Sequence, residues 1–189
     1  MNIFKSVLLM VASSVLVSSV QASEQKLNIG VLPAADSIVL YVAKEDGLFK
    51  RHDLDVTLIP FKSALEIGAA MRAGKLDGHF GDLMNVFTQN ETMAPQSVIL
   101  TTTHTTKAQR SFGLVVAPEY VSEIKSVKDL KNTQTAMSAS TIIDYLLDEM
   151  KTHEHLDDKA LKNVEVRQIP IRLQMFYKVR LKQQCYLSH

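Results

Sequence analysis

The chain has 189 residues, 46% of them hydrophobic, with 21 basic and 20 acidic side chains and a formal net charge of +1. This near balance lacks the basic excess typical of nucleic-acid-binding proteins, so we expect no nucleic acid as a partner. Cys185 is the single cysteine, which excludes a disulfide within the chain and leaves packing to hold the core.

Residues 1–22 have the pattern of a secretory signal peptide. Lys5 precedes an apolar run from Val7 to Val17, and the small-x-small sequence Val20-Gln21-Ala22 follows. The alternative, a membrane anchor, needs about 20 apolar residues, and serines interrupt this run. We therefore expect cleavage after Ala22 and export to the periplasm. Cleavage removes Lys5, one of the 21 basic residues, and none of the 20 acidic ones, which leaves a formal net charge of zero.

Three successive strand, turn and helix units follow between Leu27 and Phe87. Each apolar, β-rich run ends in small polar residues and continues into a helix-period pattern, which is typical of βαβ units on a parallel sheet. In such sheets the ligand binds beyond the carboxyl ends of the strands, where helix N-termini present free N–H groups. The predicted strands and helices are 26–32 with 38–49, 54–60 with 64–74, and 75–82 with 83–90.

The remaining pattern predicts the entry into a second unit of the same kind. Two strand-like runs, 97–107 and 110–119, come first, and the second ends at Pro118, where a central strand cannot continue. A short amphipathic helix from Ser126, a strand over 133–137, a helix over 142–151, a strand over 163–170 and a helix from Ile171 then follow. We therefore expect a first α/β lobe over 23–117 and the start of a second over 118–177.

Several phrases, in this order and spacing, resemble one protein family. They are a Pro-containing turn with Asp36-Ser37, then VAKEDGLFKRHDLDV, FKSALE, AGKLDGHFGDL, SASTIIDYLLDEM and VEVRQIPIRLQM. Together they resemble the solute-binding proteins of ABC importers, in the branch shared by nitrate, sulfonate, taurine and thiamine-precursor binding proteins. The resemblance covers roughly residues 26–177.

The resemblance implies an α/β, type II periplasmic-binding-protein fold, with the first lobe nearly complete and the second truncated. It also implies the periplasmic substrate-binding component of an ABC importer. Such a component takes a small organic or anionic solute (sulfonate, nitrate or pyrimidine-like) to a permease in the inner membrane. We expect a monomer without enzymatic activity or a cofactor.

The resemblance also implies which residues face the ligand, when the family's binding positions in both lobes are carried over to this sequence. Ser63, Asp82 and Ser140 have an alternative role as helix N-caps, and Lys62 an alternative as a solvated side chain. Helix N-termini favour an anionic ligand, whereas the negative charges of Asp36 and Asp82 disfavour one. The sequence therefore does not distinguish an anionic ligand from a nitrogenous heterocycle. The implied residues are Asp36, Ser37, Lys62, Ser63, Gly81, Asp82, Thr102, Thr103, Ser138, Ser140 and Thr141.

Catalytic and metal sites are not expected. His79 and His104 are isolated, His153 and His155 lie two residues apart on a polar segment, and no cysteine accompanies them. A thiamine-pyrimidine synthase-like enzyme is the main alternative, but the cysteine-rich motif of that enzyme is not found here. A transporter-independent periplasmic sensory module is a third possibility.

The tail over 178–189 departs from the family pattern. The family leads us to expect a phrase like GEIDAAMLPEP after the helix from Ile171, whereas the chain reads VRLKQQCYLSH. One inserted base, with suitable synonymous codons, would restore Gly-Glu-Ile-Lys-Ala-Ala-Met-Leu-Ser-Gln-Pro. We therefore hypothesise a frameshift, a truncated second lobe and impaired solute binding, and the DNA sequence of the gene tests this.

Overall fold

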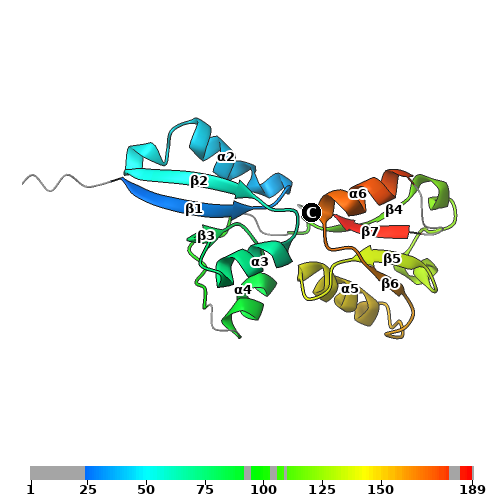
Figure 1. Cartoon of the computed structure of the whole chain (residues 1–189). Helices are drawn as coiled ribbons and strands as arrows, with labels where there is room; N and C mark the ends of the chain where they lie inside the picture. Colours follow the sequence, from blue (N-terminus) through cyan, green and yellow to red (C-terminus); the bar gives the residue numbers. More distant parts are fainter. Residues whose placement is uncertain (1–23, 92–94, 103–105, 109, 179–183, 189) are drawn as a thin grey trace, which may run out of the picture.

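The computed structural model describes residues 24–91, 95–102, 106–108, 110–178 and 184–188. The expected signal peptide, residues 1–22, lies outside this part of the chain. The described residues form two lobes, each a β-sheet with helices packed on it (Figure 1).

The first lobe contains a parallel sheet of three strands in the order β2-β1-β3. Leu27 lies opposite Val56 in the β1–β2 pair, and Ile29 lies opposite Gly78 in the β1–β3 pair. Parallel neighbours require a crossover, and helices supply it here, which confirms the predicted βαβ units. The third strand is shorter than the predicted 75–82. The bounds are β1 (Gln25–Val31), β2 (Leu54–Pro60) and β3 (Gly78–His79).

Helices cover both faces of this sheet, with α2 on one side and α3 and α4 on the other (Figure 1). Two of them end before the predicted residues 49 and 74, because Gly47 (φ 65°) and Gly74 (φ 64°) take the left-handed conformation. In each case the glycine N–H and the next N–H donate back into the last helical turn, the arrangement of a Schellman cap. The bounds are η1 (Ala35–Ser37), α2 (Ile38–Glu45), η2 (Lys50–His52), α3 (Ala64–Arg72) and α4 (Leu83–Asn90).

The predicted strand over 97–107 is wrong in the part that the structure describes. Residues 97–102 pair with no strand, and Ile99 is 97% exposed. A β-rich apolar run becomes a strand only when a neighbour pairs with its N–H and C=O groups. The edge strand β3 has only two residues and gives this run no such neighbour.

The second lobe contains a sheet in the order β4-β7-β5-β6, in which β4 is antiparallel to β7 and the other pairs are parallel. β4 falls within the expected first lobe over 23–117, yet it pairs in the second sheet. The described part of the divergent tail forms β7 between β4 and β5. The bounds are β4 (Gly113–Val116), β5 (Gln134–Met137), β6 (Lys162–Glu165) and β7 (Gln184–Ser188).

The helices of the second lobe are η3 (Pro118–Tyr120), η4 (Val127–Leu130), α5 (Ile142–His153) and α6 (Ile169–Lys178). The predicted strand over 163–170 is too long, because β6 ends at Glu165 and α6 begins at Ile169. Pro170 is the second residue of α6, where its missing N–H would have no partner within the helix in any case.

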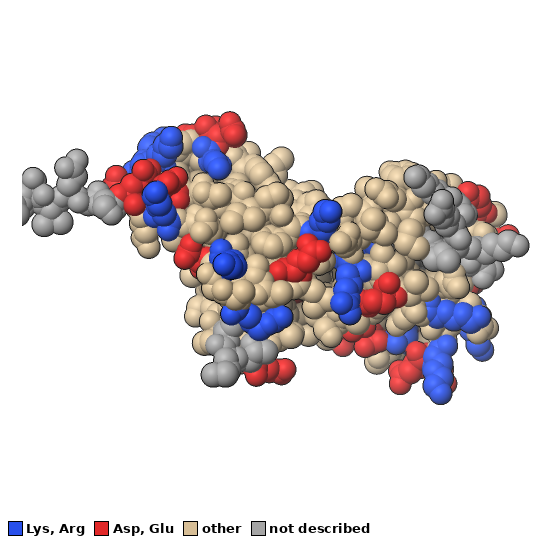
Figure 2. Space-filling model, viewed as in Figure 1, with Lys and Arg blue, Asp and Glu red and all other residues tan. Residues whose placement is uncertain are grey.

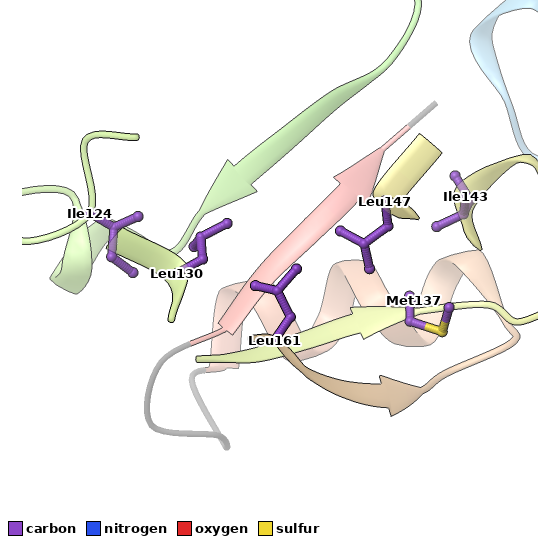
Figure 3. Close-up of a cluster of buried hydrophobic side chains, with 6 residues drawn as sticks. All are labelled: Ile124, Leu130, Met137, Ile143, Leu147 and Leu161. Carbon is purple, nitrogen blue, oxygen red and sulfur yellow. The ribbon is translucent and has the colours of Figure 1, made fainter. Parts of the chain in front are cut away.

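Each lobe has its own buried apolar cluster. In the first lobe Leu32, Ile67 and Leu76 form it. The cluster of the second lobe is larger and joins α5 to β5 and the segment before it (Figure 3). Its members are Ile124, Leu130, Met137, Ile143, Leu147 and Leu161.

Candidate functional site

Both sheets direct their carboxyl ends at the junction of the two lobes: β1 and β2 from one side, β5 and β7 from the other (Figure 1). The N-terminal ends of α3, α4, α5 and α6 follow such strands. Hydrogen bonds cross the junction, from the Ile169 N–H to the Lys62 carbonyl at 3.1 Å and from Gln168 Nε2 to Glu66 Oε1 at 3.3 Å. The junction is therefore the place where an open α/β sheet binds its ligand.

Two cavities of about 20 and 10 Å³ lie at this junction. They adjoin, since Ala64, Asp82 and Thr141 line both of them. We call the first, between α4 and α5, cavity 1, and the second, next to α6, cavity 2. Each has room for about one water molecule. In this arrangement of the lobes neither cavity has room for a small organic molecule.

Ser63 and Lys62, at the start of α3, line neither of these cavities. Ser63 is 2% exposed, and its Oγ accepts the Glu66 N–H at 3.3 Å, so it is the N-cap of α3. The Glu66 carboxylate in turn accepts the Lys62 N–H at 3.0 Å. The Lys62 side chain is exposed. This turn shapes the junction through its backbone.

Asp82 has both of the roles considered for it. Its Oδ1 accepts the Asn85 N–H at 2.9 Å, which caps α4. The residue also lines both cavities. Gly81, before it, is exposed and lines neither, and a side chain there would collide with the His79 ring, 2.8 Å away.

Asp36 and Ser37, in η1, line neither cavity. The Ser37 hydroxyl is buried and donates to the carbonyls of Leu32 at 3.0 Å and Ala34 at 2.7 Å, which closes the turn after β1. Thr102 is exposed in an irregular segment, and Thr103 lies outside the described residues.

The turn before α5 brings three predicted residues to the junction. Ser138 lines cavity 2, Ser140 lines cavity 1, and Thr141 lines both. Thr141, and not Ser140, is the N-cap of α5, since its Oγ1 accepts the Ile143 N–H at 3.2 Å. Ser140 has φ 58°, and its N–H donates to Asp144 Oδ2 at 2.9 Å.

Two further residues that line the cavities were not predicted from the sequence. Asn85, in the first turn of α4, is 8% exposed and lines cavity 1. Arg172, on α6, is 4% exposed and lines cavity 2. A single charged residue within the apolar phrase IPIRLQMF was the available signal for Arg172, because a long charged side chain is rarely buried without a function or a partner.

The junction carries charges of both signs (Figure 2). Arg167 Nε donates to Glu165 Oε1 at 3.0 Å, and Glu165 Oε2 accepts the Ala139 N–H at 2.9 Å. Arg172 Nη1 donates to the carbonyls of Val166 at 2.7 Å and Arg167 at 3.4 Å. Burial lowers the pKa of Arg172, and the negative charge of Glu165 partly opposes this. Arg172 still carries its charge at neutral pH, because a guanidinium keeps its proton in proteins.

Within the described ranges, no three His, Cys, Asp or Glu side chains gather closely enough to hold a metal ion. In the same part of the chain, no helix is both long and apolar enough to cross a membrane.

Comparison with known proteins places this geometry in a family. Residues 34–176 match the family model described as NMT1/THI5 like. No curated protein sequence gives a significant match. Among solved structures, the nitrate-binding protein NrtA of Synechocystis PCC 6803 superposes with a TM-score of 0.65 at 10% identity, covering 87% of this chain and 46% of that one.

Two sulfonate-binding proteins are also similar. SsuA of Escherichia coli gives a TM-score of 0.57 at 18% identity, over 86% of this chain and 54% of that one. SsuA of Xanthomonas axonopodis pv. citri, bound to MOPS, gives a TM-score of 0.59 at 20% identity, over 87% of this chain and 54% of that one. The chain thus spans about half the length of these structures, and at such low identity the likeness establishes the fold. The chain belongs to the NMT1/THI5-like family and has the α/β fold of type II periplasmic binding proteins.

Proposed function

We propose that this chain is the solute-binding component of an ABC importer. It binds a small organic or anionic solute (a sulfonate, nitrate or a pyrimidine-like compound) in the periplasm. It acts as a monomer, without turnover, and delivers the solute to a permease in the inner membrane.

One observation carries this proposal: polar groups from both lobes converge on the same closed junction. Asp82, at the start of α4, and Thr141, at the start of α5, line the same two cavities although they are far apart in sequence. Binding between two lobes that close is the general means by which periplasmic binding proteins enclose a solute. We accordingly propose Asp82, Ser138, Ser140 and Thr141 as ligand residues.

Thermal unfolding of the chain with a panel of solutes tests the binding function. The panel contains alkanesulfonates, nitrate, amino acids and substituted pyrimidines, each at about 10 mM so that weak binding still raises the midpoint. We expect one class to raise it by a few degrees, and Thr141→Val to reduce the effect. The absence of a shift with every solute would contradict the proposal, and conversion of a solute would indicate an enzyme.

Export is tested separately, by fractionation of cells that express the whole chain. We expect a periplasmic product whose first residue is Ser23. A product that begins at Met1 and remains in the cytoplasm would contradict the proposed location.

A further inference from the structure

Two hydrogen bonds that cross the junction belong to one group of residues, which we call the clasp. It consists of Lys62 and Glu66 from the first lobe and Gln168 and Ile169 from the second. The Lys62 carbonyl accepts the Ile169 N–H at 3.1 Å, and Glu66 Oε1 accepts a hydrogen bond from Gln168 Nε2 at 3.3 Å. The Ile169 side chain also packs against the buried apolar cluster of the first lobe. Backbone, side-chain and apolar contacts therefore join the lobes at one place.

Both halves of the clasp are also fixed within their own lobes. In the first lobe, Glu66 Oε2 accepts the Lys62 N–H at 3.0 Å, which ties the carboxylate to the backbone beside it. In the second, the Gln168 carbonyl accepts the N–H groups of Ile171 and Arg172, each at 3.1 Å, in the first turn of α6. Groups that are ordered before they meet lose little further conformational entropy when they bind each other. The clasp is therefore preorganised to hold the lobes closed.

The closed arrangement that the clasp maintains leaves no room for a solute. Ala64, which lies between Lys62 and Glu66 in the chain, lines both cavities, and Ile169 lines cavity 2. The cavities measure only about 20 and 10 Å³, room for about one water molecule each. The buried Oδ1 of Asn85, in cavity 1, has no partner among the described residues, so the closed form gains no hydrogen bond there from them. Closure of two lobes ordinarily encloses a ligand, whereas this closure takes away its space.

We propose that the clasp is an autoinhibitory contact, which holds the lobes together without a solute and has to open before a solute binds. This inference rests on the proposed binding function and adds a regulation of the same site. The apparent dissociation constant then equals that of the open form divided by the fraction of molecules that are open. Weakening the clasp therefore tightens solute binding, whereas removal of a ligand contact weakens it.

Calorimetry on the chain tests this, with nitrate and ethanesulfonate as the probes. Gln168→Ala removes the side-chain bond of the clasp but no residue that lines a cavity. Loss of one hydrogen bond shifts the balance toward the open form about fivefold, so we expect up to about fivefold tighter binding of a probe. The exposed Gln174→Ala, on α6, is the matched control and should bind like the parent chain. Equal or weaker binding by Gln168→Ala would overturn the proposal.

An exchange of the two side chains tests the clasp without any solute. Gln168→Glu places a second carboxylate against Glu66, so we expect the lobes to separate and the radius of gyration in X-ray scattering to increase. Glu66→Gln combined with Gln168→Glu restores an amide–carboxylate hydrogen bond in the reverse direction and keeps the net charge of the parent chain. We expect this double variant to return to the parent's radius. A double variant as expanded as Gln168→Glu would contradict the pairing.

The results distinguish the inference from the function on which it rests. If the parent chain and Gln168→Ala bind the same solute with equal affinity, the binding function stands and the inference alone fails. If neither probe nor any other solute of the thermal panel binds to any form of the chain, the binding function fails and the inference fails with it.

Discussion

Ser63 is the residue on which the start of α3 depends. Its buried hydroxyl oxygen accepts the Glu66 N–H, one of the N–H groups that the helix itself cannot pair. We expect Ser63→Ala to lower the free energy of unfolding by about 1 kcal/mol. Urea denaturation measures this, and Ser122→Ala, at an exposed position outside any helix, is the control. A loss no greater than that of the control would rule out the capping role.

The hydrogen bonds of Asp129 predict that the stability of the second lobe depends on pH. Its Oδ2 accepts the N–H groups of Lys125 at 3.0 Å and Ser126 at 2.8 Å, and the Ser126 hydroxyl at 2.9 Å. These bonds, of which that from Lys125 has the largest effect, hold the pKa of the Asp129 carboxyl below its ordinary value.

A carboxyl group whose pKa is lower in the folded than in the unfolded chain stabilises the fold at any pH above its unfolded pKa of about 3.9. This stabilisation is lost as the pH falls through the folded-state pKa. We therefore expect Asp129→Asn to be less stable than the parent chain at neutral pH, and the difference to shrink below about pH 4. Thermal melts across this range measure it, with the exposed Asp158→Asn as control. A difference that stays constant down to pH 2 would refute the assignment.

At the scale of elements, α5 is anchored to the second sheet by Leu147. This side chain is 0% exposed and packs in the cluster of Figure 3. Leu147→Ala leaves a cavity, so we expect a loss of about 2–5 kcal/mol in the free energy of unfolding. Leu173→Ala, on α6, removes the same atoms from a side chain that is 54% exposed, and we expect a change of about 0.5 kcal/mol or less. Chemical denaturation measures both variants. If Leu147→Ala and Leu173→Ala lose similar amounts of unfolding free energy, Leu147 does not anchor α5 to this core.

At the scale of the whole molecule, the closed junction predicts a change of shape. The bond from Gln168 Nε2 to Glu66 Oε1 joins the lobes only when they are together. Gln168→Ala removes about 1 kcal/mol from the closed state, which favours the open form about fivefold. We expect a larger radius of gyration in X-ray scattering. The exposed Gln174→Ala, on α6, serves as control, and identical scattering of both variants would argue against closure through this bond.

Much of the first lobe followed from local sequence. The alternation of β-rich runs and helix-period patterns predicted that β1, β2 and β3 belong to a parallel sheet, and Ser63 and Asp82 were predicted as possible caps. A cap is decided by residues three positions apart, as in Ser63 with Glu66, and can therefore be read along the chain. The strand over 97–107 was predicted by the same reasoning and was wrong over the described residues 97–102, because strand formation needs a partner that is distant in sequence.

The sequence by itself determined the α/β class, the family resemblance and the polar turns at the ends of the strands. The tertiary structure alone decided that β4 pairs in the second sheet, that Asp82 and Thr141 share cavities while Ser37 and Ser63 turn inward, and that Arg172 and Asn85 are buried there. The physical reason is the distance along the chain over which each interaction acts. Propensities, caps and turns arise between near neighbours in the chain, whereas burial and the lack of a polar partner depend on two lobes meeting.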